Sequence, residues 1–315
     1  MEYYKQPDEE FWELTIQVLK TSALRLEKFF IESGALGSYE LLYQEGVTKN
    51  LEEEYTMMYF FYAADFPVEA FTTMALEVLG LGDCSWEVQK KKFADYLNSM
   101  EQTFRSFPLT DSLLLVPPWD IKENQKASLH VSAGPKTIII KPAFAFGTGK
   151  HETTLLMVKF LEDSILPEDN IIEIGTGSGI LCLAGLIFGA ASANGADIET
   201  LSIQNANENL ALNLTLNPEA NLIQGSCHFE VGDFDAFTKI DVKDYVFISN
   251  ILPKVFYQNN PQMKHYLTSS RSWALSGINN ESAPDFEKWL QTLVPEQKFA
   301  RKTLNDWNIF YREEE

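Results

Sequence analysis

The sequence predicts an α/β protein of two domains: a doubly wound, Rossmann-like sheet that ends in an antiparallel hairpin, preceded by a smaller ferredoxin-like α+β domain. Three observations predict this fold. From residue 112 onward, strand-like apolar runs alternate with helical periodicity, as in a parallel sheet. One of these runs, Ile171–Ile174, leads directly into a glycine turn and a helix. The N-terminal third gives the order strand, helix, strand, strand, helix, strand, which is that of a ferredoxin-like module.

The N-terminal domain is predicted to cover residues 1–92. Apolar positions repeat every second residue in its strand-like runs and every three or four residues in its helix-like runs, and glycines or a proline bound the helices. The predicted strands are 11–20, 38–44, 56–64 and 81–92, and the predicted helices are 22–33 and 67–80. No motif in this domain carries catalytic chemistry, so its predicted role is binding or structural.

A polar amphipathic stretch, 93–111, is predicted to be a helical linker, and the larger domain covers 112–315. The predicted strands of that domain are 112–116, 137–141, 171–174, the strand that ends at Asp197, 229–231, 245–249, 272–276, 297–303 and 307–312. The predicted helices begin near Thr153, at Ile180, at Ser202, near Lys254 and at Pro284. If the N-terminal domain only presents a substrate, residues from about Pro117 onward should fold alone.

The stretch Ile171 to Ile180 reads IIEIGTGSGI and predicts a buried strand, a glycine turn and a helix. Glycine at every second position lets a ligand approach main-chain N–H groups, and the helix presents its positive N-terminal end. Asp197 follows about 20 residues after the turn, where a carboxylate can accept hydrogen bonds from both ribose hydroxyls of a nucleoside. The dinucleotide pattern GxGxxG would require glycine at Ile180. The turn and the acid together therefore predict a nucleoside site and disfavour NAD.

Polar residues fall at the carboxyl ends of the predicted strands of the larger domain. They are Glu173, Asp197, Asp233 and Asn250. Ligands of doubly wound sheets bind outside these strand ends. We therefore expect the four residues to converge on one site.

Composition and charge exclude several classes of protein. The chain carries 25 basic and 45 acidic side chains, a net charge of −20, which repels nucleic acid and anionic membranes and attracts a basic protein partner. No apolar run reaches the ~20 residues of a membrane span, and the acidic N-terminus is unlike a signal peptide. Cys84, Cys182 and Cys227 are scattered, which predicts neither a disulfide framework nor a metal site. We expect a cytoplasmic monomer.

Three segments together form a recognisable set of motifs. The loop PAFAFGTGKHETT ends at Thr154, the turn IGTGSGIL covers 174–181, and Asn250-Ile251-Leu252 follows a predicted strand. In this combination the chain resembles the PrmA family, methyltransferases that use S-adenosylmethionine to modify large-subunit ribosomal protein eleven. The resemblance covers the whole chain in layout. It implies a methyltransferase domain, a ferredoxin-like domain that grips the substrate, and methylation of lysine or N-terminal amino groups.

The resemblance also implies residues that contact the cofactor. They are Phe146, Thr154, Glu173, Gly175, Gly177, Asp197, Asp233 and Asn250. Within this set, Asp197 would hold the ribose, Asp233 the adenine amino group, and Glu173 would lie near the methionine ammonium. Phe144 and Phe146 would cover the cofactor, or instead belong to the core.

Two residues are candidates for the chemistry itself. The side-chain oxygen of Asn250, or the carbonyls of Asn250 and Ile251, would accept hydrogen bonds from the target amine. Alternatively, Asn250 would cap the helix that begins near Lys254 or contact only the cofactor. His151 would act as a proton acceptor, or instead orient Thr154 or the backbone.

Other functions stay open at this point. The same fold could methylate another protein or a small molecule, because only the N-terminal third bears on the choice of target. The chain could also be a regulator that holds the cofactor without turning it over. An NAD oxidoreductase is the remaining alternative, and Ile180 disfavours it.

Overall fold

A computed structural model describes residues 10–41, 54–92, 104–121, 135–142, 149–217 and 225–313, with the single positions 94, 101, 220 and 222. The chain divides into two compact units, Met1–Thr103 and Phe104–Glu315. No helix within these described segments is both long and apolar enough to cross a membrane.

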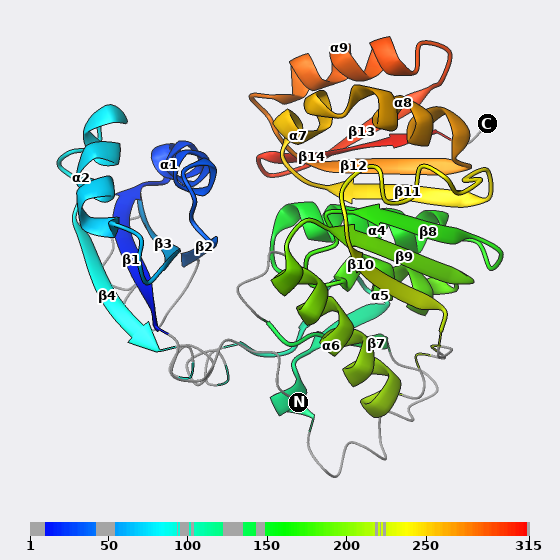
Figure 1. Ribbon diagram of the computed structural model, residues 1–315, viewed down its shortest axis with the longest axis horizontal. Helices are drawn as coiled ribbons and strands as arrows, with labels where there is room; N and C mark the ends of the chain where they lie inside the picture. The colour runs from blue at the N-terminus through cyan, green and yellow to red at the C-terminus, as the bar shows by residue number, and fades with distance from the viewer. Residues whose placement is uncertain are drawn as a thin grey trace. The chain divides into compact units, whose positions relative to one another are not determined.

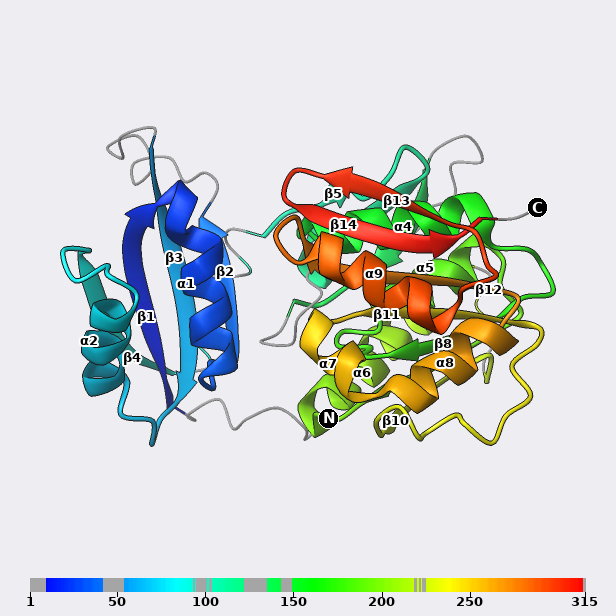
Figure 2. The same cartoon turned by 90° about the horizontal axis from the view of Figure 1, so that it is seen from above.

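The first unit is a four-stranded antiparallel sheet with two helices. Its elements are β1 (Glu10–Leu19), α1 (Lys20–Glu32), β2 (Gly37–Leu41), β3 (Tyr55–Ala63), α2 (Val68–Val78) and β4 (Trp86–Lys92). The sheet order is β2-β3-β1-β4, and both helices share one core with the sheet (Figure 2). That core includes Leu14, Ile16, Phe30, Phe60 and Leu76. The predicted order of elements is confirmed, and it is the order of a ferredoxin-like module.

The second unit is built on a seven-stranded sheet in the order β10-β9-β8-β11-β12-β14-β13 (Figure 1). Its strands are β8 (Asn170–Ile174), β9 (Ser192–Asp197), β10 (Cys227–Val231), β11 (Tyr245–Asn250), β12 (Ser272–Asn279), β13 (Phe299–Leu304) and β14 (Trp307–Arg312). Its helices are α4 (Glu152–Ser164), α5 (Ile180–Phe188), α6 (Thr200–Leu216), α7 (Pro253–Gln258), α8 (Asn260–Ser269) and α9 (Ala283–Leu293). Strands β10, β9, β8, β11 and β12 are parallel to one another. Strands β14 and β13 add an antiparallel hairpin. The predicted doubly wound sheet is confirmed.

The β-branched run of β8 explains why this strand is central. Ile171 packs in the core that contains residues of α4 and α5, whereas Ile172 and Ile174 pack in the core that contains residues of α8 and α9. Successive side chains of a strand point to opposite faces, so a strand covered on both sides needs apolar residues at nearly every position. Glu173 interrupts the run and is nevertheless buried.

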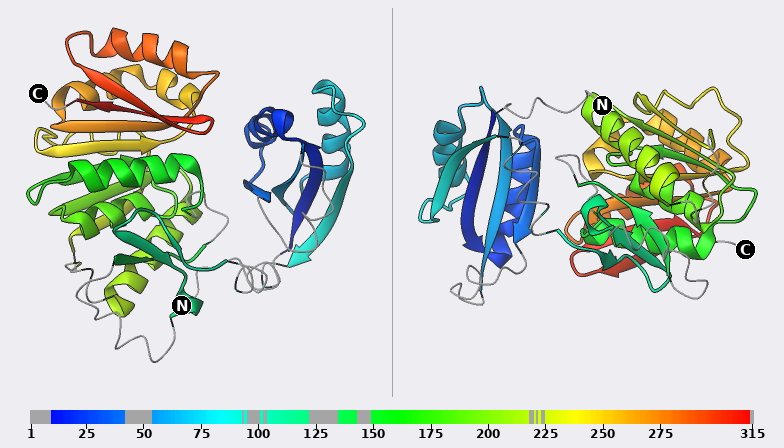
Figure 3. Two further views of the ribbon diagram at one scale, coloured as in Figure 1. Left: turned by 180° about the vertical axis from the view of Figure 1, so that it is seen from behind. Right: turned by 90° about the horizontal axis from the view of Figure 1, so that it is seen from below.

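A separate three-stranded sheet in the order β5-β6-β7 lies beside α6 (Figure 3). Its elements are β5 (Phe107–Pro108), β6 (Leu113–Val116), the short 3-10 turn η2 (Pro118–Asp120) and β7 (Lys136–Ile139). This sheet and the residues beside it contribute Phe104, Leu109, Leu113, Leu115 and Ile138 to the larger core. The described part of 93–111 from Phe104 on therefore belongs to the second unit. Independent folding of residues from Pro117 stays a prediction, and that cut would remove Phe104, Leu109, Leu113 and Leu115 from the core.

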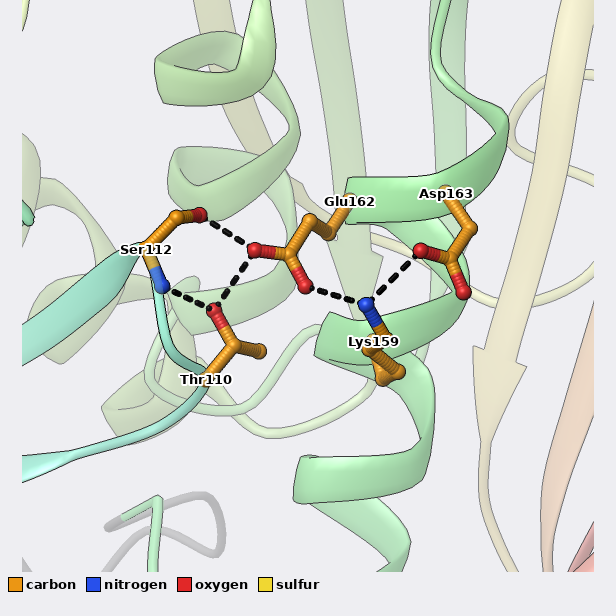
Figure 4. Close-up of polar contacts among 5 residues, drawn as sticks. All are labelled: Thr110, Ser112, Lys159, Glu162 and Asp163. Atoms are coloured by element: carbon orange, nitrogen blue, oxygen red, sulfur yellow. Dashed lines mark hydrogen bonds and ion pairs between the residues drawn. The ribbon is translucent and has the colours of Figure 1, made fainter.

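A polar cluster ties the small sheet to α4 (Figure 4). Oε1 of Glu162 accepts hydrogen bonds from Oγ1 of Thr110 at 2.9 Å and from Oγ of Ser112, and Oε2 accepts one from Nζ of Lys159 at 2.8 Å. Lys159 also pairs with Asp163 at 2.8 Å. Burial raises the pKa of Glu162, but the hydrogen bonds outweigh it and the net pKa is lowered. The ionised carboxylate thus anchors the start of the second unit to α4.

Candidate functional site

The carboxyl ends of β8, β9, β10 and β11 lie at one edge of the large sheet, because these strands are parallel neighbours. Glu173, Asp197 and Asn250 stand in the last residues of β8, β9 and β11, and Asp233 follows β10. Strand β8 lies between β9 and β11, where the order of the strands reverses. Ligands of doubly wound sheets bind at this switch point. The four residues thus lie at one edge of the sheet, and their convergence on one site stays a prediction.

The glycine turn that joins β8 to α5 depends on glycine for both conformation and space. Gly175 and Gly177 have φ values of 79° and 52°, in the left-handed region that side chains disfavour. A Cβ on Gly175 would overlap Cγ2 of Ile251. The N–H of Gly177 donates to Oδ2 of Asp197 at 2.9 Å, so the turn is tied to the end of the next strand.

Glu173 lies beneath this turn and is 1% exposed. Its Oε2 accepts hydrogen bonds from Oγ1 of Thr176 at 2.8 Å and from the N–H of Cys182 at 3.3 Å. The carboxyl group therefore holds the turn against the first turn of α5. Burial raises the pKa of Glu173 to about 7, although these hydrogen bonds oppose the rise. These contacts lie inside the fold, and a role for Glu173 beside a cofactor ammonium stays a prediction.

We expect Glu173→Gln to remove a pH dependence of stability. The folded pKa of about 7 lies above the ordinary carboxyl value of 4.5, so the folded chain binds the extra proton, and this stabilisation is lost as pH rises through 7. The free energy of unfolding of the parent protein should fall relative to that of Glu173→Gln by roughly 2.5 kcal/mol between pH 5 and pH 8. Denaturant titrations at both pH values measure the difference. Exposed Glu287→Gln is the control, and parallel curves for parent and Glu173→Gln would contradict the prediction.

Asp197 is the last residue of β9 and is half-buried. Each of its oxygens accepts one backbone hydrogen bond, Oδ2 from Gly177 and Oδ1 from Glu199 at 3.0 Å. A carboxylate oxygen has two lone pairs, so both oxygens can still accept a hydroxyl donor. Asp233 is exposed, and its Oδ1 accepts the N–H of Asp235 at 2.9 Å.

An apolar surface beside Asp197 was not predicted from the sequence. Ile198 is 71% exposed, and Val231, which pairs with Asp197 in the sheet, is also exposed. Single exposed apolar residues are ordinary, but here they adjoin the strand ends that form the site. An isoleucine directly after the acid was the signal that could have indicated a surface suited to a flat apolar ring.

Asn250 reaches from β11 to the start of α4. Its Nδ2 donates to Oγ1 of Thr153 at 3.1 Å, and among the described residues no donor reaches its buried Oδ1. The alternative that Asn250 caps the following helix is wrong, because the N-cap of α7 is Leu252. Thr154 is 1% exposed, and its Oγ1 also lacks a partner within the described segments. Phe146 lies outside the described residues.

His151 is the N-cap residue of α4. Its Nδ1 accepts the N–H of Thr153 at 3.3 Å and lies 2.8 Å from Oγ1 of the same residue. The ring also contacts Trp307 edge-on, with ring centroids 4.8 Å apart. Burial lowers the pKa of His151, although Glu152 opposes this. A half-buried, neutral ring that is already bonded to Thr153 favours the orienting role over that of a proton acceptor, and the backbone it orients is that of Thr153.

Ile251 packs between two glycines from neighbouring strands. Its side chain covers Gly175, and its peptide lies against Gly277 at a bulge in β12. Gly277 has a φ of 88°, and a Cβ there would overlap the carbonyl oxygen of Ile251. The position of the Asn250-Ile251 backbone therefore depends on glycines on both sides of β11.

A row of asparagines along α6 was also missed. Asn205, Asn209, Asn213 and Asn217 recur at every fourth residue and so share one helix face. Asn213 accepts the N–H of Ile139 at 2.9 Å and donates to its carbonyl at 2.6 Å, and Asn217 donates to the carbonyl of Thr137. These side chains satisfy the backbone of β7 along the edge that faces α6, in place of a neighbouring strand.

Asn209 extends this row to the glycine turn. Its Oδ1 accepts the N–H of Lys141 at 2.8 Å, and its Nδ2 donates to the carbonyl of Ser178 at 2.9 Å. One buried amide thus connects the segment that leads toward His151 with the turn at the end of β8. The spacing of four was visible in the sequence, but the backbone groups that the amides bind were not.

We expect Asn209→Leu and Asn217→Leu to have different effects on ligand binding. Each leaves buried backbone groups unpaired, so each should lower stability by about 1–3 kcal/mol. Asn209→Leu also releases Ser178, so we expect it to weaken S-adenosylmethionine binding by about tenfold. Calorimetric titration at a temperature where both variants are folded measures the affinity. Equal affinities in the two variants would contradict the role of Asn209.

Comparison with known proteins places these motifs in one family. The family model described as Ribosomal protein L11 methyltransferase (PrmA) matches residues 10–314. The chain is 32% identical over 211 residues to the ribosomal protein L11 methyltransferase of Limosilactobacillus reuteri, which covers 66% of this chain and 60% of that protein. It is 28% identical over 240 residues to the protein of the same name from Thermoanaerobacter pseudethanolicus, with 72% and 71% covered. The match to the Limosilactobacillus relative thus spans less than two thirds of that protein's length.

A solved structure supports the same fold. The crystal structure of ribosomal protein L11 methylase from Lactobacillus delbrueckii subsp. bulgaricus superimposes with a TM-score of 0.54. The two chains are 24% identical, and the superposition covers 67% of this chain and 98% of that one. At this identity the likeness bears on the fold alone.

Proposed function

The chain belongs to the PrmA family of ribosomal protein L11 methyltransferases, and on that premise we propose that it methylates amino groups of ribosomal protein L11 with S-adenosylmethionine. The observation that carries the proposal is Oδ1 of Asn250, which has no partner among the described residues. Nδ2 of the same amide donates to Thr153, the residue before Thr154. A glycine turn and an acid suit many nucleoside ligands. A buried acceptor on the neighbouring strand end favours transfer to a nitrogen that carries hydrogens.

The residues of the strand ends fit the proposed cofactor. Gly175 and Gly177 expose backbone without side chains, and Asp197 keeps lone pairs for the ribose hydroxyls. Ile198 offers an apolar surface for the adenine ring, with Asp233 as the acceptor for its amino group. Oγ1 of Thr154, which has no partner in the described part of the chain, is a further group for the cofactor. Phe146 as a cover stays a prediction.

The chain's own part in the reaction is to hold the target amine. When bound, S-adenosylmethionine supplies an electrophilic methyl group, which a neutral amine can attack through its lone pair. Oδ1 of Asn250 can accept a hydrogen bond from that amine and so set the direction of the lone pair. An ammonium has no lone pair, so the rate should rise with pH as the amine loses its proton.

Charge supports a basic protein as the substrate. The net charge of −20 favours encounter with a cationic partner. This attraction weakens as the salt concentration rises, because salt screens the charges. The first unit carries none of the polar residues that form the site edge, so we assign it to binding the substrate protein.

Methyl transfer to ribosomal proteins tests the proposal. Ribosomal proteins from cells that lack this gene are incubated with the purified chain and methyl-labelled S-adenosylmethionine, and each protein is then weighed by mass spectrometry. We expect the mass of ribosomal protein L11 to rise in steps of one methyl group, at lysine or N-terminal amines. Label in another protein or in a small molecule would select the alternative targets. Binding without any transfer would select the regulator.

A further inference from the structure

We propose that Thr153 is a positioning residue: its hydroxyl fixes the side-chain amide of Asn250 so that Oδ1 faces the target amine. The inference rests on the proposed function and adds to it a residue that the motifs do not assign. Three groups from two distant segments carry it, namely the ring of His151, the hydroxyl of Thr153 and the amide of Asn250. Nδ1 of His151 lies 2.8 Å from Oγ1 of Thr153, and Nδ2 of Asn250 lies 3.1 Å from the same oxygen.

The tautomer of His151 is decided by the backbone. The N–H of Thr153 points at Nδ1 from 3.3 Å. A hydrogen on Nδ1 would oppose that N–H, so Nδ1 is the unprotonated nitrogen and the ring proton is on Nε2. Burial keeps the ring neutral, because it lowers the pKa of His151 more than neighbouring Glu152 raises it.

The hydroxyl of Thr153 therefore donates its single proton to Nδ1 of His151. A separation of 2.8 Å between Nδ1 and Oγ1 requires a hydrogen between them, and with Nδ1 unprotonated that hydrogen belongs to Thr153. The hydroxyl can therefore only accept from Asn250. The NH₂ end of the amide must face Thr153, and Oδ1 must face the other way.

This orientation explains why Oδ1 of Asn250 has no hydrogen-bond donor among the described residues. A buried amide oxygen without a donor is destabilising, so its orientation needs a reason. Oδ1 of Asn250 and Oγ1 of Thr154 both lack partners among the residues that the structure describes. An acceptor held in this way selects a substrate group that donates hydrogens, which is the property of an amine.

The C-terminal hairpin contacts His151, the first of the three groups in this relay of hydrogen bonds from His151 through Thr153 to Asn250. Trp307 of β14 packs edge-on against the ring of His151. Asn305, at the tip of the hairpin, donates from Nδ2 to Oε1 of Glu152 at 2.9 Å. Among the described residues, Glu152 of α4 and Trp307 of the hairpin are two of the neighbours of His151.

Thr153→Val and Thr153→Ser separate the hydroxyl from the packing of the side chain. Valine removes the hydroxyl at nearly constant volume, and serine keeps it. We expect Thr153→Val to lower kcat by about 10²-fold while the dissociation constant of S-adenosylmethionine stays unchanged, because a misplaced reactant costs about that much. We expect Thr153→Ser to restore kcat. Thr268→Val, on the exposed face of α8, controls for loss of a helical hydroxyl.

Nuclear magnetic resonance tests the relay without requiring turnover. The ¹⁵N signals of His151 in the full chain should show a neutral ring with its proton on Nε2, and Thr153→Val should shift both Nδ1 and the side-chain amide of Asn250. Thr153→Ala replaces Thr153→Val if valine disturbs folding. A ring protonated at Nδ1, or wild-type kcat in Thr153→Val, would overturn the proposal. If the signals agree but no amine is methylated by the parent protein, the relay stands and the proposed function fails.

Discussion

Asn250→Ala is expected to lower kcat for methyl transfer by about 10²-fold or more, with a smaller effect on cofactor affinity. The variant removes the only side-chain acceptor that the described part of β11 places at the site edge without a partner. The amine would then enter without a fixed direction for its lone pair. Single-turnover kinetics with saturating substrate protein measures the methyl-transfer step, and calorimetry measures the affinity for S-adenosylmethionine.

Ser249→Ala is the matched control for Asn250→Ala. Ser249 is the preceding residue of β11, and its Oγ donates to the carbonyl of Ile174 at 2.7 Å. Its loss should cost about 1 kcal/mol of stability and leave turnover near that of the parent. The role of Asn250 would be refuted by near-parental turnover in Asn250→Ala, or by a defect found entirely in cofactor binding.

Asp197→Ala is expected to weaken S-adenosylmethionine binding by about 10- to 150-fold, or roughly 1.5–3 kcal/mol, because the ribose hydroxyls lose a charged acceptor. The structure adds a second cause. Oδ2 of Asp197 also accepts the N–H of Gly177, so the variant loosens the glycine turn as well. Calorimetric titration gives the total loss, and tight binding of NAD by the parent protein would contradict the choice of nucleoside.

A ribose analogue separates the two causes. The parent protein should bind S-adenosylhomocysteine more tightly than its 2′-deoxy analogue, because Asp197 can bond the missing hydroxyl. In Asp197→Ala this preference should disappear. An equal preference in both proteins would mean that Asp197 acts only by holding the turn.

The strands and helices of the second unit were largely predictable from local patterns. The helix predicted to begin at Ile180 is α5, which starts at that residue because the glycine turn precedes it. The row Ile171, Ile172 and Ile174 predicted a strand covered on both faces, and the two cores confirm it. Local sequence suffices here because burial on both faces leaves few residue types available.

The small sheet and the asparagine row were not predictable in the same way. Strand β7 reads as an ordinary strand, and only the tertiary structure shows that Asn213 and Asn217 pair with its backbone. Asparagine on a helix surface normally indicates solvent exposure. The contact that gives these residues a role joins segments far apart in the chain.

The sequence by itself determined the doubly wound sheet, the glycine turn, and the placement of Asp197 and Asn250 at strand ends, because each depends on spacing along one segment. Tertiary structure alone decided where the side chains of that site point. Glu173 turns inward to α5, His151 bonds Thr153, and Asn250 is held by the same threonine. The physical reason is that a hydrogen bond requires a donor and an acceptor within about 3 Å, and no spacing within one segment brings Asn250 to Thr153.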